Sequence, residues 1–211
     1  MLSLQTVDPH TLELLRAMMA EPLFADLRLV DGTALALQYG HRKSVDLDLF
    51  GKMPADEDEM KNALDKIGVV QVLKEAERIR VYMIDDVKVD FVDYTRYPWI
   101  DAPIIEDGIR LASPRDIAAM KINAIEGRGS MKDFIDIYFL LHHFSFEKIL
   151  GCYSQKYPEH NIFRALMSLT YFEDAESQFM PMMFEPVRWP EVREYISKVV
   201  KDYSDRISST S

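Results

Sequence analysis

The stretch that decides the fold of this chain is Ser44-Val45-Asp46-Leu47-Asp48-Leu49-Phe50. Apolar and acidic residues alternate along it, which is typical of a β-strand with one face in a core. Because successive side chains of a strand point to opposite faces, Asp46 and Asp48 share one face, with Cα atoms about 6.6 Å apart. The apolar residues of the stretch are expected to point the other way, into the core: Val45, Leu47 and Leu49.

The two carboxylates form a candidate metal site. Two negative charges about 5 Å apart repel by about 3 kcal/mol at an effective dielectric constant near 20, and a divalent cation between them converts this repulsion into binding free energy. Asp90, on the polar face of another predicted strand, supplies a third carboxylate if that strand lies nearby. Three carboxylates suit Mg²⁺ (or Mn²⁺), which also binds phosphate oxygens, and two such ions support an in-line nucleotidyl displacement. The alternative is a solvated polar strand face.

The composition narrows the class of protein. With 211 residues, 48% of them hydrophobic, the chain can form one large domain or two small ones with a packed core. Its formal net charge of −10 does not indicate a surface that binds nucleic acid or anionic membrane over its whole area. The single cysteine, Cys152, excludes an internal disulfide. No apolar run approaches the length of about 20 residues that a membrane span needs, and no signal peptide is recognisable, so a cytoplasmic protein is predicted.

Periodicity and turn residues predict an α+β fold with an antiparallel or mixed sheet, followed by an all-helical part. The composition changes near Ile109, so the predicted domains are residues 1–108 and 109–211. A tight hairpin turn is expected at Asp85-Asp86. The expected helices cover residues 9–19, 34–39, 56–67, 114–126, 130–143 and 191–203, and the expected strands cover residues 27–30, 45–50, 69–73, 78–84 and 87–94.

A candidate phosphate site precedes the acidic strand. Gly32 and Thr33 open a predicted helix, where backbone N–H groups attract anions and the threonine hydroxyl adds a donor. The alternative is a plain turn with Thr33 as the helix N-cap. Arg42, just before the acidic strand, would either contact phosphates or be solvated.

The first helix of the second part carries a candidate partner for phosphates. Lys121 lies in an apolar stripe, so its ammonium either snorkels to solvent or reaches into a cleft, where Arg128 could support it. Asp133 and Asp136 are spaced i, i+3 on the next helix and face the same way. Asp133 is either a capping-box residue or a functional carboxylate.

These motifs, taken in order, resemble the AbiEii/AbiGii-type nucleotidyltransferase toxin family of the DNA polymerase beta-like nucleotidyltransferase superfamily. The resemblance implies a nucleotidyltransferase-like mixed sheet flanked by helices in residues 1–108. It also implies that the helical domain of residues 109–211 completes a nucleotide cleft. The resembling segments are residues 32–37, 39–42, 44–50, 111–121 and 128–138.

The resemblance also implies roles for individual residues. The metal ligands would be Asp46, Asp48 and Asp90, and the catalytic residues would be these three with Lys121 and Asp133. The nucleotide-binding residues would be Gly32, Thr33, Arg42, Ser44, Lys121 and Asp136. One departure is Asp31, since the family usually has Gly-Gly-Thr where this chain has Asp31-Gly32-Thr33. Aspartate tolerates unusual backbone angles better than most residues, but its charge beside a phosphate site is expected to weaken nucleotide binding or alter its specificity.

The leading hypothesis is a Mg²⁺-dependent enzyme that transfers a nucleoside monophosphate from an NTP to an acceptor hydroxyl. Family members act as toxins of toxin–antitoxin or phage-defence pairs, and some modify tRNA ends, so an RNA acceptor and an antitoxin partner are implied. Asp31 motivates an alternative, a non-catalytic nucleotide-binding or protein-interaction module on the same fold. A third hypothesis is an aminoglycoside-like small-molecule nucleotidyltransferase, because a negative surface suits cationic acceptors.

Overall fold

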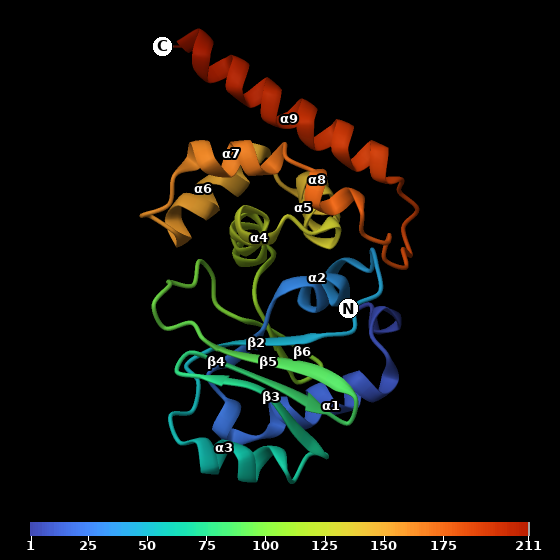
Figure 1. Cartoon of the computed structure of the whole chain (residues 1–211), viewed down its shortest axis with the longest axis vertical. Helices are drawn as coiled ribbons and strands as arrows, with labels where there is room; N and C mark the ends of the chain where they lie inside the picture. The colour runs from blue at the N-terminus through green and yellow to red at the C-terminus, as the bar shows by residue number, and fades with distance from the viewer. Residues whose placement is uncertain (211) are drawn as a thin grey trace. The chain divides into compact units, whose positions relative to one another are not determined.

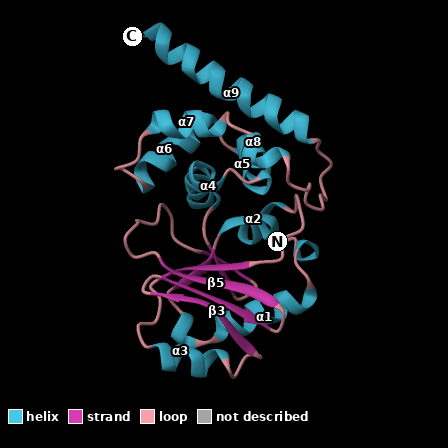
Figure 2. Ribbon diagram, viewed as in Figure 1, coloured by secondary structure: helices cyan, strands magenta, loops and turns pink. Residues whose placement is uncertain are grey.

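The computed structural model describes residues 1–210, and within this range seven strands form one sheet. The chain divides into two compact units, which are taken separately here. The first unit comprises Met1–Pro98 and Ala102–Ser113, and it carries the strands drawn in magenta in Figure 2. The second unit comprises Trp99–Asp101 and the chain from Pro114 onward, and it is built of helices.

The sheet of the first unit is mixed, which confirms the predicted α+β class. Its strand order is β3-β4-β5-β2-β1-β7-β6. The pairs β2–β5 and β1–β7 are parallel, and the other neighbouring pairs are antiparallel. The strands are β1 (Leu27–Leu29), β2 (Leu47–Gly51), β3 (Val70–Ala76), β4 (Ile79–Ile84), β5 (Val87–Asp93), β6 (Ile104–Glu106) and β7 (Ile109–Leu111).

The register between β2 and β5 places two of the predicted site residues side by side. Asp48 lies directly opposite Asp90, and the neighbouring positions pair in step along both strands. The alternate residues of these strands, such as Leu49 and Phe91, are buried. A parallel pair with one apolar and one acidic face therefore forms the centre of the sheet.

Helices cover both faces of this sheet in the first unit. Figure 1 shows α1 (Pro9–Ala20) and α3 (Glu57–Leu64) on one face and α2 (Asp31–Tyr39) on the other. Local signals explain where these helices begin and end. The side chain of Asp8 accepts a hydrogen bond at the start of α1, and α2 ends at Gly40, whose positive φ of 75° suits a residue without a Cβ.

The predicted hairpin at Asp85-Asp86 is confirmed. These residues join β4 to β5 and have φ angles of 45° and 65°, the left-handed values that a two-residue type I′ turn requires. Aspartate is one of the few residues other than glycine that enters this region at modest cost.

The second unit packs its helices around α4 (Pro114–Arg128), whose buried face includes Ile117 and Ile122. The rings of Phe134, Phe172 and Trp189 form a further apolar cluster, with centroids 4.9 to 5.9 Å apart. The helices of this unit are α4 (Pro114–Arg128), α5 (Met131–His143), α6 (Phe146–Lys156), α7 (Ile162–Leu169), α8 (Glu173–Glu176) and α9 (Trp189–Thr210).

Several predicted boundaries differ from the structure: α2 begins at Asp31 instead of residue 34, and α3 ends at Leu64 instead of residue 67. Strand β3 runs to Ala76 instead of residue 73, and α9 spans Trp189–Thr210 instead of residues 191–203. The acidic strand begins at Leu47 instead of Val45, and the Val45 side chain is 50% exposed, so its predicted place in the core is wrong. The predicted domain change fell at Ile109, whereas β7 (Ile109–Leu111) pairs with β1 inside the sheet of the first unit. A three-residue strand is too short for its periodicity to be recognised from the sequence alone.

Among the residues that the structure describes, none of the helices is both long enough and apolar enough to cross a membrane.

Candidate active site

The acidic face of the sheet gathers three carboxylates. Asp48 and Asp90 are opposite each other on adjacent parallel strands, so their Cα atoms lie about 5 Å apart. Asp46 precedes β2 by one residue. All three side chains are partly exposed, in contrast to the buried leucines between them. The face points away from α3, because Phe91 on the other face pairs with Arg80, whose guanidinium contacts Met60 of α3.

Lys88 belongs to the same face and was not among the predicted site residues. Its Nζ donates a hydrogen bond to Oδ1 of Asp90 at 2.5 Å. Burial lowers the pKa of Lys88, but this hydrogen bond and the charges of Asp90, Asp48 and Asp46 outweigh burial and raise the pKa above its ordinary value. All three carboxylates therefore act on one ammonium group.

The donor set fits a hard divalent cation. The ligand atoms offered on this face are carboxylate oxygens on a rigid pair of strands, which Mg²⁺ and Mn²⁺ prefer over nitrogen or sulfur. The Lys88 ammonium already shows that the face attracts a cation. Partial exposure leaves room for water and phosphate oxygens to complete the coordination.

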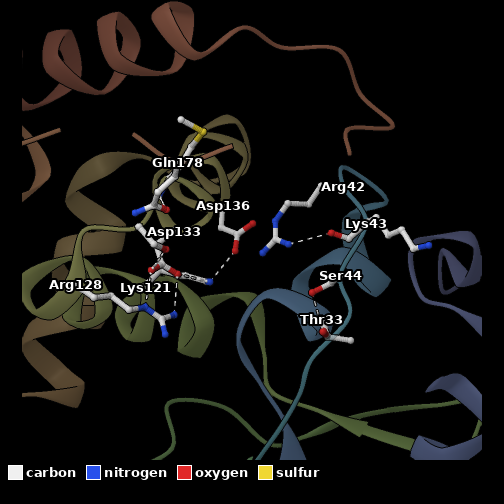
Figure 3. A network of polar contacts seen from close by, with 11 residues as sticks. Thr33, Arg42, Lys43, Ser44, Lys121, Arg128, Asp133, Asp136 and Gln178 are labelled. Atoms are coloured by element: carbon white, nitrogen blue, oxygen red, sulfur yellow. Dashed lines mark hydrogen bonds and ion pairs between the residues drawn. The ribbon is translucent and has the colours of Figure 1, made fainter. Parts of the chain in front are cut away.

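The segment that carries Asp46 is held by the first turn of α2. The hydroxyl of Thr33 donates to the main-chain oxygen of Asp46. It also shares a hydrogen bond of 2.8 Å with the hydroxyl of Ser44 (Figure 3). Thr33 is buried, and the N-cap of α2 is Val30, so the alternative of Thr33 as N-cap is wrong. Thr33 positions the residue that precedes the acidic strand.

Gly32 and Arg42 are packed against each other. A Cβ at Gly32 would collide with the guanidinium of Arg42, so only glycine leaves space for it. Arg42 is 2% exposed and donates to the main-chain oxygen of Lys43 at 3.1 Å. The alternative that Arg42 is solvated is therefore wrong, and a buried cation lies beside the first turn of α2.

Asp31 has a φ of 55°, in the left-handed region. A glycine adopts this conformation at no steric cost, whereas a residue with a Cβ is strained in it. Aspartate adopts the left-handed angle here, in line with its tolerance of unusual backbone angles, and α2 begins at Asp31 with Gly32 and Thr33 in its first turn.

The second unit contains a buried ion-pair cluster on α4 and α5. Nζ of Lys121 lies 2.7 Å from Oδ1 of Asp133 and 2.7 Å from Oδ2 of Asp136. Lys121 is only 1% exposed, so the alternative that it snorkels to solvent is wrong. Arg128 reaches Oδ2 of Asp133 at 3.0 Å (Figure 3). The hydroxyl of Ser130 donates to the same oxygen at 2.6 Å.

These contacts decide the state of Asp133. Burial by itself raises the pKa of its carboxyl, but Lys121 and Arg128 outweigh burial and hold the pKa at about 2, below the ordinary 3.8. Asp133 is thus a carboxylate at neutral pH, and it accepts three side-chain donors. Asp133 and Asp136 are spaced i, i+3 on α5, so both carboxylates lie on one face of the helix and contact the same lysine.

The structure thus sorts the predicted site residues into two groups. The first unit holds Gly32, Thr33, Arg42, Ser44, Asp46, Asp48 and Asp90, and the second unit holds Lys121, Asp133 and Asp136. Each group is drawn together within its own unit. That both groups act on one nucleotide stays a prediction. Lys88 was missed, although its i, i+2 spacing from Asp90 already placed it on the same strand face.

The fold is that of the nucleotidyltransferases. A candidate nucleotidyltransferase from H. pylori superimposes with a TM-score of 0.60 at 16% identity, covering 96% of this chain and 95% of that one. The antibiotic-resistance factor ANT(2'')-Ia gives a TM-score of 0.54 at 17% identity over 69% of this chain and 88% of its own. MenT4, a nucleotidyltransferase toxin from Mycobacterium tuberculosis H37Rv, gives a TM-score of 0.53 at 17% identity, covering 90% of this chain and 81% of its own.

Comparison of sequences identifies the family of nucleotidyltransferases to which the chain belongs. The family described as "Nucleotidyl transferase AbiEii toxin, Type IV TA system" matches residues 13–200. An uncharacterized protein of Aquifex aeolicus (strain VF5) is 35% identical over 186 residues, which cover 84% of this chain and 88% of the relative. The chain belongs to the AbiEii nucleotidyltransferase toxin family, and the resemblance seen in its motifs is confirmed.

Proposed function

We propose that this protein is a Mg²⁺- or Mn²⁺-dependent nucleotidyltransferase that transfers a nucleoside monophosphate from an NTP to an acceptor hydroxyl. The observation that carries the proposal is the parallel register that sets Asp48 opposite Asp90 on the exposed acidic face. In the proposed reaction the acceptor oxygen attacks the α-phosphate, and pyrophosphate leaves. A bound divalent ion would neutralise charge on the phosphates and activate the acceptor oxygen.

The residues of the first unit have separate tasks in this proposal. Asp46, Asp48 and Asp90 hold the ion, and Asp90 also offers a carboxylate that can take the proton of the acceptor hydroxyl. Thr33 keeps Asp46 in place through its main-chain oxygen. The first turn of α2, with Gly32, Arg42 and Ser44, binds the nucleotide phosphates, because backbone N–H groups at a helix start and a guanidinium both favour anions.

The roles of the second unit rest on family membership. Lys121 would contact the triphosphate, Asp136 would bind the nucleotide, and Asp133 would take part in catalysis. The ion pairs among them support fixed positions for these groups. The same membership supports an antitoxin protein as partner, an RNA such as tRNA as acceptor, and a cytoplasmic location, all of which are part of the proposal.

The experiment is incubation of the protein with labelled NTPs, Mg²⁺ and total RNA. We expect Asp48→Asn to lower transfer by about 10²–10³-fold, since removal of one electrostatic contact to the reacting groups costs this much in other enzymes. Asp58→Asn is the matched control, because Asp58 is an exposed aspartate on α3, which covers the other face of the sheet. Its activity should equal that of the wild type.

No transfer to any acceptor, together with equal NTP binding by the wild type and Asp46→Ala, would contradict the proposal. Titration calorimetry with ATP, GTP, CTP and UTP separates it from the non-catalytic alternative, which predicts binding without turnover or no binding at all. Transfer to aminoglycosides but not to RNA would favour the small-molecule alternative.

A further inference from the structure

The candidate metal site already contains a cation that belongs to the chain. Lys88 and Asp90 are two residues apart on β5, so they share the acidic face. The Lys88 ammonium lies 2.5 Å from Oδ1 of Asp90, an oxygen that a metal ion would need. Neither the metal-ligand set nor the nucleotide-binding set of the proposed function includes this lysine.

We propose that Lys88 is a built-in counter-cation of the carboxylate site, which pairs with Asp90 in the absence of metal and competes with the divalent ion for it. The proposal rests on the proposed function, because it takes Asp46, Asp48 and Asp90 as the metal ligands. Lys88 is here a positioning residue that sets how tightly the site binds a bare ion.

The physical need for such a cation comes from the register of the sheet. The pairing of β2 with β5 forces Asp48 and Asp90 into adjacent positions, and Asp46 adds a third negative charge. Like charges this close repel unless a cation lies among them. One ammonium on the same face lowers this repulsion in the folded protein before any metal arrives.

The exposure of the pair makes it reversible. The side chains of Lys88 and Asp90 are 41% and 23% exposed, so the ammonium can move into water when a divalent ion takes its place. Ion pairs with this much exposure contribute little net stability, and a doubly charged ion that binds several oxygens readily displaces them. Lys121, by contrast, is 1% exposed and is held between two carboxylates, so it has no comparable freedom.

The test measures Mn²⁺ binding to the whole chain from the electron paramagnetic resonance signal of free Mn²⁺. We expect Lys88→Met to bind Mn²⁺ about tenfold more tightly than the wild type, because the ion no longer has to displace an ammonium from Asp90. Lys88→Arg should stay near the wild type, since the guanidinium keeps the competing charge. Lys74→Met is the matched control: it removes the same charge from the exposed edge strand β3, two strands from β5, and should change the affinity less than about twofold.

If the wild type binds Mn²⁺ and Lys88→Met binds it equally well or more weakly, the inference about Lys88 is overturned, but the proposed function is not. If Lys88→Met does not fold, as judged by circular dichroism, Lys88→Gln provides the same neutral change with a polar side chain. Unfolding of both neutral variants, which Mn²⁺ does not reverse, also overturns the inference, because Lys88 would then be structural. No Mn²⁺ binding by the wild type, with Asp48→Asn indistinguishable from it, overturns the proposed function and this inference with it.

Discussion

The acidic face of the sheet and the buried cluster of the second unit use the same types of charge in opposite ways. On the sheet, the charges of three carboxylates act on one ammonium, and all four groups are partly exposed. In the cluster, the carboxylates of Asp133 and Asp136 pair with Lys121, and Arg128 also pairs with Asp133. The first arrangement is the one to which the proposed function assigns a divalent cation, and the second buries its ion pairs.

This difference predicts opposite effects of charge removal on stability. Lys121→Met leaves two buried carboxylates without their shared cation and should lower the free energy of unfolding by about 3–5 kcal/mol, measured by urea denaturation. Asp48→Asn relieves repulsion on the sheet and should leave stability unchanged or raise it by up to about 1 kcal/mol. Lys74→Met, on the exposed strand β3, controls for the loss of one positive charge and should stay within about 0.5 kcal/mol of the wild type. A loss below about 1 kcal/mol for Lys121→Met would remove the contrast between the two regions.

Acid should weaken the buried cluster in a defined range of pH. The folded pKa of Asp133 is about 2, below its ordinary value of 3.8, so its contribution is fully present above about pH 4 and is lost as the pH falls toward 2. The free energy of unfolding should fall by about 2 kcal/mol across this range, as urea titrations at each pH will show. Asp133→Asn should flatten this part of the curve, and Asp58→Asn should not. A curve for Asp133→Asn parallel to the wild type would show that another group causes the acid sensitivity.

The smallest effect is expected at the link between α2 and the acidic strand. Thr33→Val keeps the shape of the side chain but removes the donor to the main-chain oxygen of Asp46. It should cost about 1 kcal/mol in stability and weaken Mn²⁺ binding a few fold, because Asp46 is less well held. Thr33→Ser retains the hydroxyl and should behave like the wild type. Equal Mn²⁺ affinity in all three proteins would show that Asp46 does not need this support.

Much of the first unit could be predicted from local patterns. The alternation of Asp48 with leucines and the Asp85-Asp86 turn are properties of short segments, and the structure bears them out. The start of β2 was predicted less accurately. Val45 fits the alternation but lies outside the strand and is exposed, because burial depends on what covers a residue and not on its period.

The partners of the charged residues were less accessible to sequence reasoning. The spacing of Asp133 and Asp136 indicated a shared helix face, but it did not show that Lys121 from another helix fills the space between them. Likewise, Arg42 was expected beside phosphates or in solvent, and its burial against Gly32 requires the packing of two separate segments. Such contacts join residues that no local pattern links.

The sequence by itself determined the two-faced strands, the tight hairpin and the motifs of the AbiEii family. These features follow from periods of two and 3.6 residues and from the backbone angles that single residues tolerate. Only the tertiary structure decided that β2 and β5 are parallel neighbours, that Asp48 meets Asp90, and that Lys88 pairs with Asp90 while Lys121 is sealed between carboxylates. The physical reason is that register and burial are set by the whole sheet and the helices packed on it, and these place distant segments beside one another.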